Sequence, residues 1–596
     1  MYSLAHITHE AVEKIGGIGS VLEGLMTSPL YQHQVKRSIL IGPIATHLAI
    51  DSEKRLGEEG RVLYSSIDQI DRASLGSRLR PVERAFNVAL VYGIRTYVES
   101  ASGRTGESEV LLVDVFGVNP DRLNAFKWRL WKTFGLDSRQ YESNWDYEEY
   151  VRLAKPAFYA LLALLEEKDY PCVVMGHEFM GMPTALATIL EGKEKFRTVF
   201  YGHECATARR VVENHPGHDT MFYNLLEKAS SDGLYLEDVF GSMDHHLRHA
   251  LVSRAHLCDA IITVGEWTRR EMQFLNERLK HCQIDVIPNG LPAFQIDLDK
   301  KLRSRRMLLD YSKALFGQEP QFLLTHVARP VISKGFWRDL KVASEMDRHF
   351  SEDRRWDNGE GDRGLQAVLY LLSTGGGTRR PQDILAMEHQ YGWPRHHREG
   401  YPDLVGPELD IHRDVEAFNT NHHHVQVVLI NQFGFSQSSI GRRLPAGMDL
   451  SDLRRATDVE FGMATYEPFG ISPLEPLGCG AICVISSVCG CKDLIEQASP
   501  NGAANVIIAD FTEMNDPQSI DQLTAMTSHR RDQIEQKVAI EVADRLMVSL
   551  PANDQQRHAL LESGQNLMAA MSWDRVLETR LLPLLKRITT NSNTGD

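Results

Sequence analysis

The sequence predicts an α/β protein with parallel sheets, and three observations lead to this fold class. Short apolar runs typical of buried strands alternate with helix-length segments along the chain. At roughly 150 residues per domain, the 596 residues suggest about four domains, although two large α/β domains fit as well. A strong turn signal, Pro288-Asn289-Gly290 followed by Pro292, separates an early set of apolar runs from a later one. We therefore predict two Rossmann-like halves.

The predicted strands are divided between the two halves. The early set comprises Ser38–Ile41, Val110–Val115, Cys172–Met175, Thr198–Tyr201 and Ala260–Val264. The later set comprises Phe322–Val327, Val425–Ile430, Phe461–Thr465, Ile482–Ser486 and Val506–Ile508. Residues Glu148–Glu167 are predicted to form one helix, in which Pro156 marks a kink or a boundary.

The turn near residue 290 sets the predicted domain limits. Residues 1–290 form the N-terminal domain and residues 291–572 the C-terminal domain. Residues 573–596 contain an amphipathic helix, which is a candidate to pack back on the N-terminal domain.

Two polar stretches interrupt the C-terminal domain. Residues 351–364 are too polar for a core and are expected to form a loop. Residues 375–424 are too long for a simple connection and are interpreted as an insertion. This insertion carries His389, His396, His397, His412 and His422–His424. We expect it to be solvated or to contact another copy of the chain, with adventitious metal binding as the alternative.

Composition excludes several classes of protein. The balance of 65 basic and 80 acidic residues gives a net charge of −15, which disfavours a protein that coats nucleic-acid phosphates. Eight cysteines are too few for a disulfide scaffold. The first residues lack the pattern of a signal peptide, and no apolar run approaches the roughly 20 residues that span a membrane. We expect a soluble cytoplasmic protein without nucleic-acid or membrane partners, and the sequence leaves open whether it forms a homo-oligomer.

The first candidate binding motif is a glycine-rich stretch that leads into an apolar helix. It reads Lys14-Ile15-Gly16-Gly17-Ile18-Gly19. Glycines before a helix let backbone N–H groups approach an anion, and Lys14 would add a full positive charge. The alternative is an ordinary turn, because the motif does not follow a strand as a dinucleotide fingerprint does.

The second motif places two cations directly after a predicted strand. Arg329 and Lys334 follow Phe322–Val327 in the stretch HVARPVISKG. Ligands of open parallel sheets bind beyond the carboxyl ends of the strands, where these cations are expected. Arg can hold a diphosphate through two N–H donors, while Lys acts as a point charge. The alternative is a solvated loop with surface charges.

The third motif contains two carboxylates eight residues apart, Glu467 and Glu475, around a glycine-containing turn. A helix is predicted to start near Ser472. The free N–H groups of Gly470, Ile471 and Ser472 could then receive a phosphate, while the carboxylates accept sugar hydroxyls. A capping box between Ser472 and Glu475 is the alternative, and both interpretations can hold together.

Four cysteines follow this motif with the spacing C-x3-C-x5-C-x-C. They are Cys479, Cys483, Cys489 and Cys491. None of the familiar two-residue spacings of a zinc site occurs, so small buried thiols are favoured over a metal site.

Together the three motifs resemble those of a known enzyme family. Lys-x-Gly-Gly, Arg-x4-Lys and Glu-Pro-Phe-Gly-x4-Glu resemble the retaining glycosyltransferases of the GT-B fold, and are most similar to glycogen synthase of the animal and fungal type. Further stretches fit that family in consistent order: Ile41–Pro43, Asn124–Gly135, His177–Gly181, Tyr201–Arg209, Thr263-Val264 and Pro288–Gly290. The Arg-x4-Lys spacing and the C-terminal residues resemble bacterial members, and regulation through an arginine cluster is not expected.

The resemblance implies a fold and a reaction. The fold would be two Rossmann-like parallel-sheet domains facing a central cleft. The reaction would move glucose from UDP-glucose or ADP-glucose to the non-reducing end of an α-1,4-glucan such as glycogen, without a metal or other cofactor. Two alternatives stay open: transfer to a small acceptor by the same fold, and a silent homologue that binds glucan or nucleotide.

The resemblance also implies roles for individual residues. Arg329 and Lys334 would grip the donor diphosphate, Glu467 the hydroxyls of the transferred glucose and Glu475 the ribose. His203 would line the cleft near the sugar. The remaining donor-site residues would be Lys14, Gly16, Gly17, Phe469, Gly470, Ile471 and Ser472.

Overall fold

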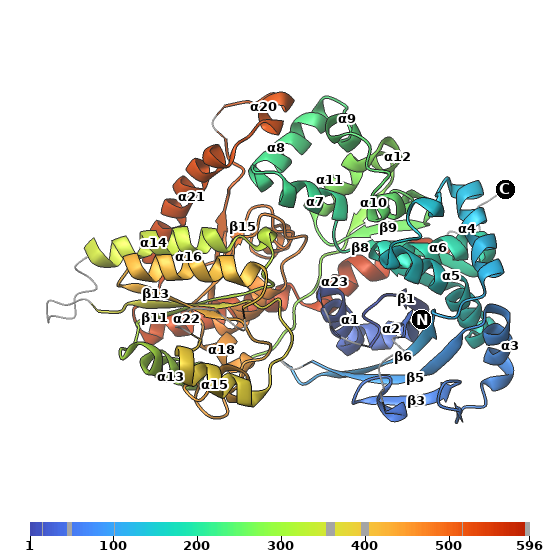
Figure 1. Cartoon of the computed structure of the whole chain (residues 1–596), viewed down its shortest axis with the longest axis horizontal. Coiled ribbons are helices and arrows are strands. Elements are labelled where there is room, and N and C mark those ends of the chain that lie inside the picture. Colours follow the sequence, from blue (N-terminus) through green and yellow to red (C-terminus); the bar gives the residue numbers. More distant parts are fainter. Residues whose placement is uncertain are drawn as a thin grey trace. The chain divides into compact units, whose positions relative to one another are not determined.

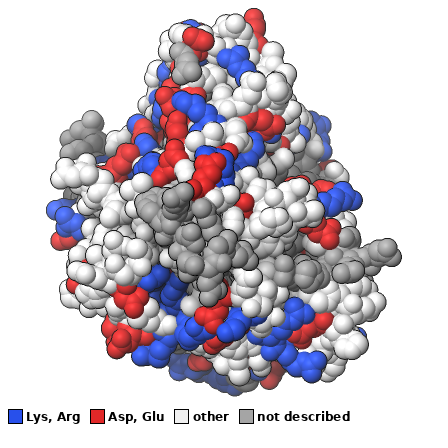
Figure 2. Space-filling view, turned by 90° about the vertical axis from the view of Figure 1, so that its left-hand side faces the viewer, with Lys and Arg blue, Asp and Glu red and all other residues white. Residues whose placement is uncertain are grey.

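The computed structural model describes residues 1–12, 14, 16–44, 51–99, 102–352, 364–394, 404–514 and 516–590. The chain folds into two compact units. Unit 1 comprises residues 1–208, 229–292 and 572–596, and unit 2 comprises residues 209–228 and 293–571. Among the described residues, none of the helices is long and apolar enough to cross a membrane. Basic and acidic side chains are interspersed on the face shown in Figure 2.

Unit 1 contains a ten-stranded sheet with the order β10-β9-β8-β7-β1-β2-β6-β5-β3-β4 (Figure 1). Its strands are β1 (Tyr2–Ile7), β2 (Val35–Pro43), β3 (Gly60–Ser65), β4 (Ile70–Asp71), β5 (Ala89–Val98), β6 (Thr105–Asp114), β7 (Cys172–His177), β8 (Phe196–Gly202), β9 (Ala260–Thr263) and β10 (Ile284–Val286). The strands from β10 to β6 are parallel, whereas β5, β3 and β4 pair antiparallel. The prediction of an entirely parallel sheet is therefore wrong at this edge. The short connection between β5 and β6 leaves no room for a crossover helix and imposes antiparallel pairing.

The helices of unit 1 mostly connect its parallel strands. They are α1 (Gly17–Thr27), α2 (Pro29–Gln34), α3 (Gly76–Phe86), α4 (Pro120–Phe134), α5 (Trp145–Leu164), α6 (Glu178–Glu191), α9 (Leu236–Phe240), α10 (Leu247–Val252), α11 (Glu266–Leu275), α12 (Glu277–Lys280), α23 (Trp573–Val576) and α24 (Leu582–Thr590), with a π-helical turn at Leu577–Leu581. Local sequence fixes their ends. In α4, the side chain of Asn119 accepts hydrogen bonds from the first backbone N–H groups, and Gly135 stops the helix with a φ of +65°.

The C-terminal helices pack within unit 1 through Trp573. Two glycines make room for this side chain: a Cβ at Gly24 would lie 1.9 Å from the indole Nε1, and a Cβ at Gly290 would lie 2.5 Å from the Trp573 Cα. Any larger residue at either glycine would have to displace the helix. Trp573 is thus part of the core of unit 1.

Unit 2 contains a parallel six-stranded sheet with the order β13-β12-β11-β14-β15-β16. Its strands are β11 (Phe322–Val327), β12 (Ala367–Leu372), β13 (Val425–Ile430), β14 (Val459–Gly462), β15 (Ile482–Ser486) and β16 (Val506–Ala509). Its helices are α13 (Leu298–Phe316), α14 (Phe336–Glu352), α15 (Pro381–Tyr391), α16 (Pro407–Asn421), α17 (Gln437–Ile440), α18 (Leu450–Ala456), α19 (Lys492–Ala498), α20 (Ile520–Thr524), α21 (Ser528–Ser549) and α22 (Asp554–Ala570). The boundary helices α7 (Ala206–Asn214) and α8 (His218–Ser231) connect the two units. Apolar residues of α14, α16 and α21 cover one face of the sheet, and those of α13 and α18 cover the other (Figure 1).

Only part of the histidine-rich region is solvated as predicted, since His389 and His423 are exposed but helix α16 belongs to the core. Helix α16 is the crossover between the parallel strands β12 and β13, and its Val415 and Phe418 belong to the apolar core. His412 on the same helix is buried, and His422 bonds Ser344 at 2.8 Å. His396 and His397 lie outside the described residues, as does most of the predicted loop at 351–364.

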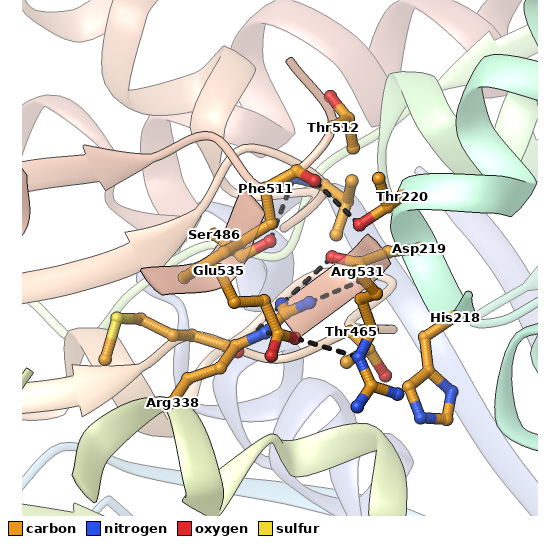
Figure 3. A network of polar contacts seen from close by, with 12 residues as sticks. His218, Asp219, Thr220, Arg338, Thr465, Ser486, Phe511, Thr512, Arg531 and Glu535 are labelled. Atoms are coloured by element: carbon orange, nitrogen blue, oxygen red, sulfur yellow. Dashed lines mark hydrogen bonds and ion pairs between the residues drawn. The ribbon is translucent and has the colours of Figure 1, made fainter. Parts of the chain in front are cut away.

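Residues 209–228 pack into unit 2 although the sequence analysis assigned them to the N-terminal domain. A buried ion network holds them there (Figure 3). The guanidinium of Arg338 on α14 bonds the carboxylate of Asp219 at 2.6 and 2.9 Å and that of Glu535 on α21 at 2.9 Å. All three side chains are inaccessible to solvent. Three helices distant in sequence are therefore joined by one guanidinium.

Candidate functional site

The second and third motifs meet at one edge of the sheet in unit 2. Strands β11 and β14 are parallel neighbours, so the loops that follow them emerge at the same edge. Lys334 follows β11 and Glu467 follows β14, and their Nζ and Oε2 atoms lie 2.5 Å apart. Arg329 is exposed on the loop directly after β11 and makes no ion pair with the described residues. The structure thus brings together Lys334 and Glu467 and places Arg329 on the same loop as Lys334.

The loop that carries Lys334 is fixed to the end of β14. The hydroxyl of Ser333 donates to the Glu213 carboxylate at 2.7 Å, and its carbonyl accepts the N–H of Thr465 at 2.8 Å. Gly335 follows with a φ of +69°, and a Cβ there would lie 2.6 Å from the Met463 carbonyl oxygen. Only glycine fits this turn without strain, so the ammonium group is presented by a rigid loop.

The turn after Glu467 is equally constrained. Gly470 adopts a φ of +95°, and a Cβ at this position would lie 2.6 Å from the Cys489 Sγ. The carbonyl of Phe469 accepts the N–H of Cys491 at 2.8 Å. These thiols are buried, as are those of Cys479 and Cys483. In the described chain, no group of three or more His, Cys, Asp or Glu side chains is arranged to hold a metal ion.

The helix that begins at Ser472 is a 3-10 helix, Ser472–Cys479, and not an α-helix. Pro476 has no N–H to donate to the carbonyl of Ser472, as residue 476 would in an α-helix. The capping box that was the alternative interpretation is not formed, because the Ser472 hydroxyl donates to the Val327 carbonyl at 2.8 Å. Within the described residues, the N–H groups of Gly470, Ile471 and Ser472 make no hydrogen bond. They remain available to an anion.

Arg454 on α18 is a residue of this region that the sequence analysis missed. Its guanidinium lies 2.6 Å from Glu475, 2.8 Å from the fully buried Glu460 and 2.9 Å from the Ser472 hydroxyl. Burial lowers the pKa of Arg454, but the two carboxylates outweigh it and raise that pKa above its ordinary value. The guanidinium of Arg454 therefore fixes the orientation of the Glu475 carboxylate. No sequence motif marks it, because the contact is made through space.

The glycine-rich motif of unit 1 is organised by another residue that was not predicted. The carboxylate of Glu10 accepts the N–H of Gly16 at 2.9 Å and that of Gly19 at 2.8 Å. Lys14 pairs with Glu23 at 3.1 Å. A Cβ on Gly17 would meet no described atom within 4 Å, so packing does not require glycine there. The N–H groups of Gly16 and Gly19 therefore already have the Glu10 carboxylate as their partner. The space next to the Gly17 Cα is open.

His203, also in unit 1, follows β8 and is held by the neighbouring strand end. Its Nε2 lies 2.8 Å from the Nδ1 of His177, the last residue of β7. The buried carboxylate of Glu178 accepts the backbone N–H of His203 and that of Glu204. Glu178 adopts a φ of +57°, which is strained for a residue with a side chain. Burial, followed by the charge of Glu204, raises the pKa of Glu178 to about 8, so this carboxyl is largely protonated at neutral pH.

Comparisons with known proteins address the fold. No protein-family model and no curated protein sequence matches the chain. The N-terminal domain of trehalose-6-phosphate phosphatase from Candida albicans is similar in structure, with a TM-score of 0.50 and 11% identity over 99% of this chain and 97% of that one. An α,α-trehalose-phosphate synthase (UDP-forming) from Burkholderia vietnamiensis has a TM-score of 0.47 at 12% identity, covering 100% of this chain and 99% of that one. The catalytic domain of starch synthase IV from Arabidopsis thaliana, bound to ADP and acarbose, has a TM-score of 0.45 at 15% identity, covering 95% and 99%. The predicted fold class, two α/β domains of the GT-B type, is confirmed.

Proposed function

We propose that the chain is a retaining glucosyltransferase of the glycogen synthase type. It would transfer glucose from UDP-glucose or ADP-glucose to the non-reducing end of an α-1,4-glucan. The observation that carries the proposal is the Lys334–Glu467 pair, which lies beyond the carboxyl ends of two adjacent parallel strands. Ligands of open parallel sheets bind at such an edge.

Charge and hydrogen-bonding capacity at this edge match a nucleotide diphosphate sugar. Arg329 and Lys334 supply positive charge for the diphosphate, and the N–H groups from Gly470 to Ser472 supply donors. Glu475, held by Arg454, is suited to ribose hydroxyls. The proposal keeps the roles that the resemblance implies for the remaining residues. His203 would lie near the sugar, and Lys14, Gly16, Gly17 and Phe469 would belong to the donor site.

The Lys334–Glu467 pair also suggests how the donor is received. A diphosphate carries more negative charge than one carboxylate and would compete with Glu467 for the ammonium group. The released carboxylate would then accept hydroxyls of the glucose. As the bond to the sugar breaks, charge grows on the diphosphate, and preorganised cations stabilise it most at that moment. The proposal therefore requires no metal ion for departure of the leaving group.

A donor assay tests the proposal. Purified protein is incubated with glycogen and either UDP-glucose or ADP-glucose, and both nucleotide diphosphate release and glucose incorporation are measured. Incorporation from one donor supports the proposed reaction. Release without incorporation points instead to a small acceptor, and no release from either donor contradicts the proposal.

A pair of variants connects the activity to the site. Lys334→Ala should abolish transfer, whereas Lys313→Ala should retain it. Lys313 is a suitable control because it also pairs with a glutamate in unit 2, Glu319 at 3.1 Å, but on the exposed side of α13. Equal activity of the two variants would contradict the assignment of Lys334.

A further inference from the structure

A continuous chain of hydrogen bonds runs through unit 1 and ends at His203. The Ser38 hydroxyl lies 2.8 Å from the hydroxyl of Tyr31, which lies 3.0 Å from the Nε2 of His6. The Nδ1 of His6 lies 3.0 Å from the Nε2 of His177. The Nδ1 of His177 lies 2.8 Å from the Nε2 of His203. Five side chains from α2, three strands and a loop thus share one line of contacts.

The inner part of this chain is closed to solvent. His6 and His177 are 0% exposed and Tyr31 is 2% exposed, whereas His203 is partly accessible. Burying an imidazole costs free energy unless each of its nitrogens has a partner, and here both nitrogens of each inner ring have one. The chain therefore connects a partly accessible residue, His203, to a buried end that water does not reach.

The three imidazoles are neutral at physiological pH. Burial lowers the pKa of His6 and of His203 to about 3 and lowers that of His177 well below its ordinary value. A neutral imidazole has one N–H donor and one acceptor nitrogen. Each ring in the line must therefore donate on one side and accept on the other. The tautomer of one ring then determines the tautomers of the other two.

Only two arrangements then satisfy every contact. In the first, Tyr31 donates to His6, His6 to His177 and His177 to the Nε2 of His203, so that His203 carries its proton on Nδ1. In the second, every bond is reversed and the Tyr31 hydroxyl donates to Ser38. The first is favoured, because a phenol O–H is a good donor and an imidazole nitrogen is a stronger acceptor than a serine hydroxyl.

We infer that Tyr31, His6 and His177 are positioning residues that hold the proton of His203 on Nδ1 and so make this atom a hydrogen-bond donor to a sugar hydroxyl. Tyr201 supports the same orientation, since its ring stacks on that of His203 with centroids 4.3 Å apart. The inference rests on the proposed function for the identity of the ligand. The tautomer itself is a property of the protein alone.

The test removes one hydroxyl at the buried end and reads the effect at His203. Tyr31→Phe is the test variant, and Tyr147→Phe is its matched control. Tyr147 is likewise fully buried in unit 1, and its hydroxyl bonds Ser138 at 2.8 Å, but it is not connected to the histidines. Both variants lose one buried tyrosine–serine bond. Tyr31→Phe also loses its bond to His6 and should therefore lose more thermal stability than the control.

The kinetic result should separate them. We expect Tyr31→Phe to lower kcat about tenfold with KM changed less than twofold, and Tyr147→Phe to change neither more than twofold. In a His203→Ala background, Tyr31→Phe should have less than a twofold further effect, because it acts through His203. Additive losses in the double variant, or equal losses in Tyr31→Phe and Tyr147→Phe, would overturn the inference.

A spectroscopic measurement distinguishes this failure from failure of the proposed function. In protein labelled with 15N-histidine, the His203 signals are those that disappear in His203→Gln. We expect an unprotonated Nε2 and a protonated Nδ1 for His203, and a mixture of both tautomers in Tyr31→Phe. A protonated Nε2 in the unmodified protein, or an unchanged spectrum in Tyr31→Phe, would overturn the inference even if no sugar transfer is detected.

Discussion

The ammonium group of Lys334 and the carboxylate of Glu467 lie 2.5 Å apart, although 133 positions separate them in the chain. The two side chains are 20% and 14% exposed, so the pair is formed at an accessible edge and not within the core. Under the proposed function, a diphosphate would replace Glu467 as the partner of Lys334. A sugar hydroxyl would replace Lys334 as the partner of Glu467. The pair therefore holds the positive charge of Lys334 and the negative charge of Glu467 next to each other, where the two charges balance.

Neutralising either member should impair catalysis more than folding. We expect Lys334→Met and Glu467→Gln each to lower kcat/KM by about 10²–10³, because the charge acts on groups that change during the reaction. The melting temperature should change little, since partly exposed ion pairs contribute at most about 1 kcal/mol. Steady-state kinetics and thermal melting check both statements. A double variant should lose much less than the product of the single losses, and a fully multiplicative loss would contradict a shared role.

Replacing Arg454 should weaken nucleotide binding. In Arg454→Lys the positive charge remains, but one ammonium cannot reach Glu460, Glu475 and Ser472 as the planar guanidinium does. We expect about a tenfold increase in the Kd of the nucleoside diphosphate, measured by calorimetry. Arg455→Lys on the same helix is the control, because Arg455 bonds Asp452 and Ser304 instead. The same loss of affinity in both variants would show that the effect is not specific to Glu475.

Acid should destabilise the protein through its buried histidines. Burial lowers the pKa of His6 to about 3, so the folded state stays neutral while the unfolded chain binds a proton below about pH 6.5. The free energy of unfolding should therefore fall as the pH decreases from about 6.5 toward 3, by about 1 kcal/mol for such a histidine at pH 5.5. Unfolding of the unmodified protein and of His6→Gln at pH 7.5 and 5.5 checks this. An identical pH dependence in both would exclude His6 as a source.

Removal of Arg338 should destabilise unit 2 strongly. Arg338→Met leaves the carboxylates of Asp219 and Glu535 buried without their shared partner, which should cost about 3–5 kcal/mol. Residues 209–228 should also become more sensitive to protease. Arg306→Met is the control, since Arg306 is half exposed in its ion pair with Asp310 and should cost at most about 1 kcal/mol. Comparable shifts of the denaturation midpoint for the two variants would contradict the importance of the network.

Two glycines of α1 should respond to substitution in opposite ways. A Cβ on Gly24 would collide with Trp573, so Gly24→Ala should lower the melting temperature. A Cβ on Gly17 meets no described atom, so Gly17→Ala should leave stability unchanged and, under the proposed function, weaken donor binding. Thermal melting and donor titration distinguish the two effects. A lowered melting temperature of Gly17→Ala would show that packing requires glycine at this position.

The sequence predicts most of the internal parallel strands because strands buried on both faces are nearly continuous apolar runs, but it missed β12 although Ala367–Leu372 is such a run. The predicted strands Phe322–Val327 and Val425–Ile430 are confirmed as β11 and β13 with the same bounds. Strand β1 was missed because His6 interrupts its apolar pattern, and this buried histidine has a hydrogen-bond partner at each ring nitrogen. The antiparallel edge was missed because the segments that form β3, β4 and β5 were not predicted as strands, although β5 is adjacent in sequence to its partner β6.

The site was predicted only as far as local motifs extend. Lys334 and Glu467 stand in recognisable stretches, and their pairing follows from the adjacency of β11 and β14. Arg454 and Glu10 stand in no motif and act on backbone or side-chain groups brought to them by the fold. Residues of this kind become visible only in three dimensions.

The route of the chain has a consequence for synthesis. It passes between the two units after residues 208, 228, 292 and 571, so each unit is assembled from separated stretches of sequence. The space beside Gly24 and Gly290 stays empty until Trp573 has left the ribosome. Unit 1 therefore starts first during translation and finishes last, and a fragment that ends near residue 290 would expose an unfilled core.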